Sequence, residues 1–203
     1  DVISVLDFIT KNGTTILLMN NCNIGDEGME QIASFIMDRG CPLIALFLAE
    51  NSIGDVGIKA LDEALMENTV LKYVNLLGNK NVSVKAAEDL AGTFLDSNSL
   101  VTICGVLPEA FPESRELSIT RMSPAESRII AAELAKGRSE LNILDLDANH
   151  GIDGINYEPV FQALQFNKEL TTLSCAQFRL ASQPDTFIDT LISSLSTNTT
   201  LKS

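Results

Sequence analysis

The chain has 203 residues, with 14 Lys and Arg against 27 Asp and Glu, so its formal net charge is −13, and 45% of its residues are hydrophobic. This is the composition of a folded acidic protein, and no apolar run approaches the ~20 residues that cross a bilayer. Because a strongly negative surface repels phosphate backbones and anionic lipid, we expect neither nucleic acid nor a membrane as partner and favour a basic protein.

The first predicted element is the end of a helix over residues 1–12, with Val5, Phe8 and Ile9 as its apolar positions. The chain starts at Asp1 without Met or a signal-like segment, and Leu201 would begin a further repeat. We therefore expect a fragment of a longer protein or repeat array.

A repeat begins at residue 14. Residues 43–57, LIALFLAENSIGDVG, align with residues 14–28, TTILLMNNCNIGDEG, in the frame L-x-x-L-x-L-x-x-N/C-x-I. The frame returns at Leu71, at Leu141 and, more loosely, at Leu170. The second leucine position of each unit falls at 17, 46, 74, 103, 144 and 173, with spacings of 29, 28, 29, 41 and 29 residues. This period predicts a repeat architecture.

Each unit is predicted to open with a short strand, because the two leucines of L-x-L share one strand face. The Asn or Cys three positions after the second leucine is expected to turn inward, where an Asn can hydrogen-bond the turn backbone. The segments Ile24-Gly25-Asp26 and Ile53-Gly54-Asp55 are expected to supply an apolar plug, a flexible turn and a helix N-cap.

A helix is predicted after each turn, because apolar residues recur at the i, i+3, i+4 and i+7 spacing. The clearest stripes are Met29, Ile32, Ala33 and Ile36, then Ala87, Leu90, Ala91 and Phe94, and finally Ile188, Leu191, Ile192 and Leu195. Shorter stripes are Ile58, Leu61 and Leu65, and Val160, Ala163 and Leu164. The expected fold is therefore α/β, with parallel strands lining one side and helices the other.

The 41-residue spacing marks an irregular unit at residues 100–122. It holds a further strand at 116–119, followed by a helix with Ser123 as N-cap and Pro124 as its first residue. One unit has thus lost its helix, and a loop at 107–116 would replace it. That loop is a candidate contact element, with a neutral insertion as the alternative.

With its 28 to 29 residue period and its N/C-x-I-G-D-x-G step, the chain resembles leucine-rich-repeat proteins of the long-repeat, ribonuclease-inhibitor-like type. The resemblance implies one domain over residues 1–203, a curved horseshoe solenoid of about seven strands with strands on its concave face and helices on its convex face. It also implies no cofactor and protein binding as the usual activity. Members include ribonuclease inhibitors, activators of the small GTPase Ran, actin-filament regulators of the tropomodulin and leiomodin kind, and sensor ends of innate immune receptors, and the fold does not choose among them.

Residues that point out of the concave strands are the candidate binding residues. An apolar cluster on an open face often marks a binding site. The alternatives are that Leu and Phe entered these positions by neutral drift, or that a neighbouring segment of the intact protein covers them. Two acidic residues farther along suit a basic partner. The candidate partner-binding residues are Ile16, Leu18, Phe47, Tyr73, Asn75, Leu77, Asp145 and Asp147.

Few side chains suit catalysis or metal binding. The chain has one histidine, His150, and four cysteines without a C-x-x-C pair, a pattern that favours a reduced, intracellular and cytoplasmic protein. Residues 145–156 place oxygen ligands at calcium-loop spacing, but His150 replaces the required Gly and Asn156 the final Glu. We expect no catalytic residue, no metal, no cofactor and no small-molecule substrate.

These observations favour a non-enzymatic scaffold that binds a protein through its concave strand face. One alternative is a regulator of another enzyme, such as a GTPase activator or an inhibitor. The other is a structural subunit of a large assembly.

Overall fold

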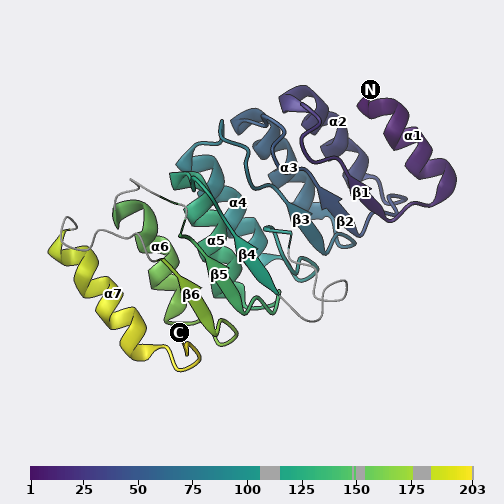
Figure 1. Ribbon diagram of the computed structural model, residues 1–203. Helices are drawn as coiled ribbons and strands as arrows, with labels where there is room; N and C mark the ends of the chain where they lie inside the picture. Colours follow the sequence, from purple (N-terminus) through teal and green to yellow (C-terminus); the bar gives the residue numbers. More distant parts are fainter. Residues whose placement is uncertain (106–114, 148, 150–153, 176–183, 203) are drawn as a thin grey trace. The chain divides into compact units, whose positions relative to one another are not determined.

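The computed structural model in Figure 1 describes residues 1–105, 115–147, 149, 154–175 and 184–202. The chain divides into two compact units, Asp1–Gly105 and Val106–Ser203. The first holds α1 (Val2–Asn12), β1 (Ile16–Leu18), α2 (Gly25–Met37), β2 (Ala45–Phe47), α3 (Asp55–Glu67), β3 (Tyr73–Asn75) and α4 (Val84–Asp96). The second holds β4 (Glu116–Ser118), α5 (Pro124–Lys136), β5 (Ile143–Asp145), α6 (Gly154–Leu164), β6 (Thr172–Ser174) and α7 (Asp185–Thr197).

Each unit contains one three-stranded parallel sheet, in the order β1-β2-β3 and β4-β5-β6. In the first sheet, Leu17 pairs with Leu46 and Leu46 with Val74, which is the register that the repeat alignment predicts. The alternation of parallel strands and helices is therefore confirmed. Within the described residues, none of the helices is both long and apolar enough to pass through a membrane.

The core of each unit lies between its sheet and its helices. The leucine-frame residues Leu17, Leu46 and Leu48 are buried. The predicted apolar stripes of α2, α3 and α4 are also buried throughout, so these three helices each turn the expected face toward the core.

Inward-facing asparagines hold the turns that follow the strands. Asn79 accepts hydrogen bonds at Oδ1 from the backbone amides of Asn51 and Ile53, at 2.9 and 3.1 Å, and donates from Nδ2 to the carbonyls of Leu48 and Leu76. Asn51 and Asn149 make corresponding bonds, so the predicted role of these asparagines is confirmed. Cys22 differs, because its side chain is exposed on the turn after the edge strand β1.

Aspartates at the helix starts serve the next helix rather than their own. The N-cap positions of α2 and α3 are Ile24 and Gly54, and neither makes a side-chain cap. Asp26 instead accepts from the amides of Gly54 and Gly57, at 2.6 and 3.0 Å, and Asp55 accepts from the Ser83 amide at 2.7 Å. The expectation that these aspartates cap their own helices is wrong.

The predicted start of α5 is confirmed. Ser123 Oγ accepts from the Glu126 amide at 3.2 Å, and the Glu126 carboxylate accepts from the Ser123 amide at 2.6 Å. This reciprocal capping box, with Pro124 as the first helical residue, fixes where the helix begins.

A second set of asparagines, the bridging asparagines Asn68, Asn167 and Asn198, joins neighbouring helices at their C-terminal ends. Each donates from Nδ2 to the last turn of the preceding helix, at the carbonyls of Ile36 (2.7 Å), Leu134 (2.8 Å) and Leu164 (2.7 Å). Each also accepts at Oδ1 from two amides of its own loop. These residues satisfy helix-end carbonyls that would otherwise lack a partner.

Two terminal helices differ from their predicted patterns. In α1, Leu6 and Ile9 are buried and Phe8 is exposed, so the predicted position of Phe8 in the core is wrong. In α7, Phe187 and Ser194 are the buried residues, whereas the predicted stripe residues Ile192 and Leu195 are exposed. Among the described residues α6 is the helix against which α7 packs, so a narrower strip of α7 is covered than in a helix between two neighbours.

The irregular unit is partly described. Where a strand is predicted near residue 103, Tyr73 and Thr102 form an isolated bridge, as do Asn75 and Cys104, instead of a strand. Gly105 follows with φ +80°, and a Cβ there would lie 2.6 Å from Asn75 Nδ2, so the turn at this position requires glycine. Most of the predicted 107–116 loop lies outside the described residues.

Candidate functional site

Parallel register brings the first-sheet candidate residues into adjacent rows. Ile16, Ala45 and Tyr73 form one row, and Leu18, Phe47 and Asn75 form another. Because side chains alternate along a strand, these rows lie on the sheet face opposite the buried leucine column. We call this surface, with Leu77, the open face of the first sheet.

Exposure on the open face is uneven. Ile16 and Leu18 on β1 are 51% and 68% exposed, and Tyr73, Asn75 and Leu77 are half-buried. Phe47 is only 6% exposed, so the expectation that it faces solvent is wrong. Phe47 lies on the central strand between Leu18 and Asn75, and parallel strands are about 4.8 Å apart, which leaves little room for water on either side of the ring.

Side-chain hydrogen bonds to the backbone hold the rim of the open face. Asn20 Oδ1 accepts from the Ala49 amide at 2.8 Å, and Asn75 Oδ1 accepts from the Leu77 amide at 3.1 Å. Both amides follow a strand, so the polar side chains fix the backbone that carries the apolar residues.

Asp145 is the last residue of β5 in the second sheet, and Asp147 lies in the turn that follows it. Both are half-buried, and Asp145 accepts from Ser118 Oγ at 3.2 Å and from the Asp147 amide at 2.9 Å. Nearby Cys175 has its thiol pKa raised by burial and, to a lesser extent, by the negative charge of Asp147. The structure thus groups the two aspartates with Ser118 and Cys175 within the second unit.

The calcium-loop spacing at residues 145–156 is described only in part, and Asn149 is one of its described residues. Asn149 is buried, accepts from the Met122 amide at 2.5 Å and donates to the carbonyl of Ile119 at 2.6 Å, so its side chain already has partners. His150 and Asp153 lie outside the described residues. In the described ranges, no group of three or more His, Cys, Asp or Glu side chains is arranged to hold a metal ion.

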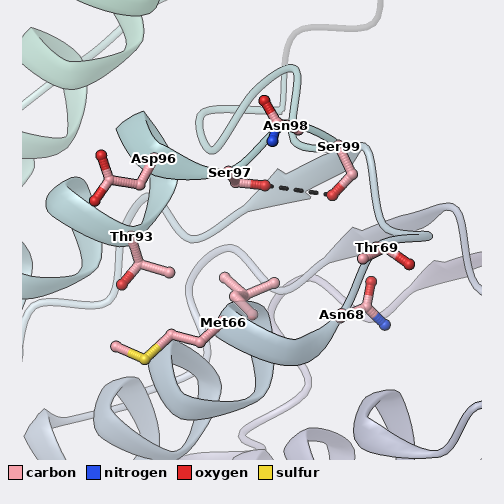
Figure 2. Close-up of a pocket in the computed structure, with 9 residues that line it drawn as sticks. Met66, Asn68, Thr69, Thr93, Asp96, Ser97, Asn98 and Ser99 are labelled. Atoms are coloured by element: carbon pink, nitrogen blue, oxygen red, sulfur yellow. Dashed lines mark hydrogen bonds between the residues drawn. The ribbon is translucent and has the colours of Figure 1, made fainter.

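A groove that the sequence analysis did not anticipate lies at the C-terminal ends of α3 and α4. It has a volume of about 560 Å³ and is lined by Leu65 and Met66 of α3, Thr93 and Asp96 of α4, and Ser97 and Ser99 of the following loop, among others (Figure 2). The sequence did hold a signal for it. Asn-x-x-Leu occurs at 68–71, 167–170 and 198–201, whereas residues 97–100 read Ser-x-x-Leu.

No protein-family model matches this chain, and no curated protein matches it either. Among solved structures, it is similar to one titled "Leiomodin-1 Actin-Binding Site 2 (ABS2)", with 16% sequence identity and a TM-score of 0.49, over 98% of this chain and 90% of that one. A likeness at this level says nothing about what the present chain binds.

Proposed function

We propose that the chain carries a leucine-rich-repeat fold of the ribonuclease-inhibitor-like type and acts as a non-enzymatic scaffold that binds another protein through the open face of the first sheet. The fold part is supported by hydrogen bonds that recur at the repeat period. Asn51 contacts Cys22 at a separation of 29 residues, and Asn79 contacts Asn51 at a separation of 28.

The observation that carries the binding role is the exposure of two large aliphatic side chains on the edge strand β1, Ile16 at 51% and Leu18 at 68%. Half-buried Tyr73 and Leu77 extend the apolar surface across the sheet. A partner that covers these side chains removes apolar area from water without ordering a flexible segment, so little conformational entropy is lost. The net charge of −13 and the aspartates at 145 and 147 favour a basic partner.

The test compares substitutions on and off the open face. Photo-crosslinking from position 18 of the 203-residue chain in native lysate identifies the protein in contact, and its affinity is then measured with purified components. Ile16→Asp with Leu18→Asp should weaken this binding at least about tenfold, because two charges would be buried against the partner. Val56→Asp, a change at a similarly exposed aliphatic residue on α3, should leave it unchanged.

Equal affinity of the open-face variant and the wild type would contradict the proposal. If the partner is an enzyme, its turnover with and without the chain separates the two roles. A scaffold leaves turnover unchanged, and a regulator alters it.

A further inference from the structure

The groove between the ends of α3 and α4 shares no residue with the open face, and its wall departs from the repeat. Asn68 donates to the Ile36 carbonyl 32 residues before it, and the residue 32 before Ser97 is Leu65. A bridging asparagine at position 97 would therefore donate its hydrogen bond to the backbone carbonyl of Leu65. Ser97 has a shorter side chain, and its Oγ accepts from the Leu100 amide at 3.2 Å and lies 3.3 Å from Ser99 Oγ (Figure 2).

In this arrangement the backbone carbonyl of Leu65 is the acceptor that receives no asparagine donor. Within the part of the chain that the structure describes, no hydrogen bond reaches its oxygen. At the three bridging asparagines, the equivalent carbonyl receives an N–H donor from the neighbouring repeat at 2.7 to 2.8 Å. The repeat itself therefore shows which group fits here: an N–H donor that enters from the groove.

Charge in the groove favours a positive donor. Helices α3 and α4 end at Glu67 and Asp96, and the C-terminal end of a helix carries a partial negative charge. The Asp96 carboxylate adds a full charge, and none of the residues that line the groove is Lys or Arg. Met66, which is 65% exposed, gives one wall an apolar surface, against which the methylene stem of a long basic side chain can pack.

We propose that the α3–α4 groove binds an ammonium or guanidinium group carried by a Lys or Arg side chain of a partner protein. One N–H of the cation donates to the Leu65 carbonyl, in the place of the missing asparagine amide. The other N–H groups face the hydroxyls of Thr93, Ser97 and Ser99, and Asp96 lies in the same lining. This site does not depend on the open-face proposal, because it uses other residues.

The first test titrates the isotope-labelled 203-residue chain with acetyl-arginine amide and acetyl-lysine amide, and follows backbone amide resonances by NMR. Shifts should concentrate at residues 65–69 and 93–99. Acetyl-citrulline amide, which keeps the shape of arginine without its charge, should bind at least about tenfold more weakly. Equal shifts with citrulline, or the absence of shifts in these two segments, would overturn the proposal.

The second test restores the bridge. Ser97→Asn supplies the missing Nδ2 donor, so it should weaken binding of acetyl-arginine amide at least about tenfold and raise the melting temperature. Val56→Asn, which places the same amide on an exposed residue of α3 outside the groove lining, should bind within about threefold of the wild type. Unchanged binding by folded Ser97→Asn would refute the role of Leu65. Should that variant not fold, Asp96→Asn decides, because undiminished binding by it would refute the role of charge.

The source of the cation is tested with putrescine, a small free diamine, and with an arginine flanked by glycines in a pentapeptide. The pentapeptide should bind at least as tightly as the blocked amino acid, and more tightly than putrescine. Tighter binding of putrescine at the same amides would make the ligand a diffusible cation and would overturn the assignment to a protein side chain.

Discussion

The Asp26 carboxylate accepts a hydrogen bond from the backbone amide of Gly54 at 2.6 Å, across 28 residues of sequence. The same Oδ1 accepts from Gly57 at 3.0 Å, so one carboxylate of α2 satisfies two of the free amides at the start of α3. Because the start of a helix carries partial positive charge, this contact combines a cap with a favourable charge interaction. The start of α3 is thus capped by the unit before it, which couples these two neighbouring units.

Replacing Asp26 by Ala should therefore lower the free energy of unfolding by about 1.5 kcal/mol, because the amides of Gly54 and Gly57 lose their acceptor. Asp26→Asn keeps an oxygen acceptor and loses the charge, so its loss should be about half as large. Urea denaturation of both variants and the wild type measures the difference. If Asp26→Ala had the same free energy of unfolding as the wild type, water would replace the carboxylate at no cost and the prediction would be wrong.

The two glycines Gly57 and Gly92 should respond in opposite directions to substitution by Ala. A Cβ at Gly57 would lie 2.8 Å from both Asp26 Oδ1 and Ile53 Cγ2, so Gly57→Ala should destabilise the protein by about 1–3 kcal/mol. Gly92 lies within α4 with open space around its Cβ position, so Gly92→Ala should stabilise by about 0.5–1 kcal/mol. Thermal denaturation of the two variants checks both expectations: the melting temperature of Gly57→Ala should fall below that of the wild type, and that of Gly92→Ala should rise above it.

These glycines also show what the sequence could and could not predict. The sequence analysis assigned a turn to the first glycine of the G-D-x-G step and no role to the second. Gly28 and Gly57, the second glycines, lie inside α2 and α3, where they allow close approach of neighbouring side chains. Local patterns predicted the six strands of the described residues, because L-x-L depends on neighbours in the chain. They also predicted a strand near residue 103, where the structure has isolated bridges instead. The partner of Asp26 could not be predicted, since the same Gly-Asp pair can cap its own helix or the next one.

The residues of the open face were predicted correctly, but their exposure was predicted only in part. Register followed from the repeat alignment, so Ile16, Leu18 and Tyr73 could be assigned to one surface. The exposure of a side chain depends on the side chains of the strands on either side of it. The sequence pattern does not show whether a strand lies at the edge or in the centre of the sheet. Phe47 was assigned to solvent for this reason, although its neighbours enclose it.

Phe47 and Leu18 should therefore differ strongly in their effect on stability. Phe47→Ala should cost about 3 kcal/mol, because it leaves a cavity in the central strand row. Leu18→Ala should change the free energy of unfolding by less than about 0.5 kcal/mol, because the side chain is largely in water. Chemical denaturation of the two variants measures this contrast, and equal losses would mean that Leu18 is also packed.

The four cysteines should react with alkylating reagents in an order set by exposure. Cys22 is exposed, whereas Cys41 and Cys104 are buried, and burial raises the thiol pKa of Cys41 and Cys175. A brief pulse of iodoacetamide should label Cys22 first and Cys175 more slowly, because only the thiolate reacts. Cys41 and Cys104 should be labelled after unfolding. Peptide mass spectrometry gives the order, and early labelling of Cys104 would contradict the described packing.

Alkaline pH should destabilise the second unit through Tyr157. Its side chain is buried on α6, its hydroxyl donates to the Asn149 carbonyl at 3.3 Å, and burial raises its pKa from 10.0 to about 12. A raised folded-state pKa means that the neutral phenol contributes its full stability below pH 10, and that this contribution is lost as the pH rises from 10 to about 12.

Tyr157→Phe isolates this effect, because phenylalanine cannot ionise. Its free energy of unfolding should fall less than that of the wild type between pH 10 and 12, although the loss of one hydrogen bond makes it about 1 kcal/mol less stable at neutral pH. Tyr157→Phe should also remove little of the tyrosinate absorbance of the folded protein at pH 11, because Tyr157 is still mostly protonated at that pH. Parallel pH profiles of the two proteins would show instead that Tyr157 titrates as if in water.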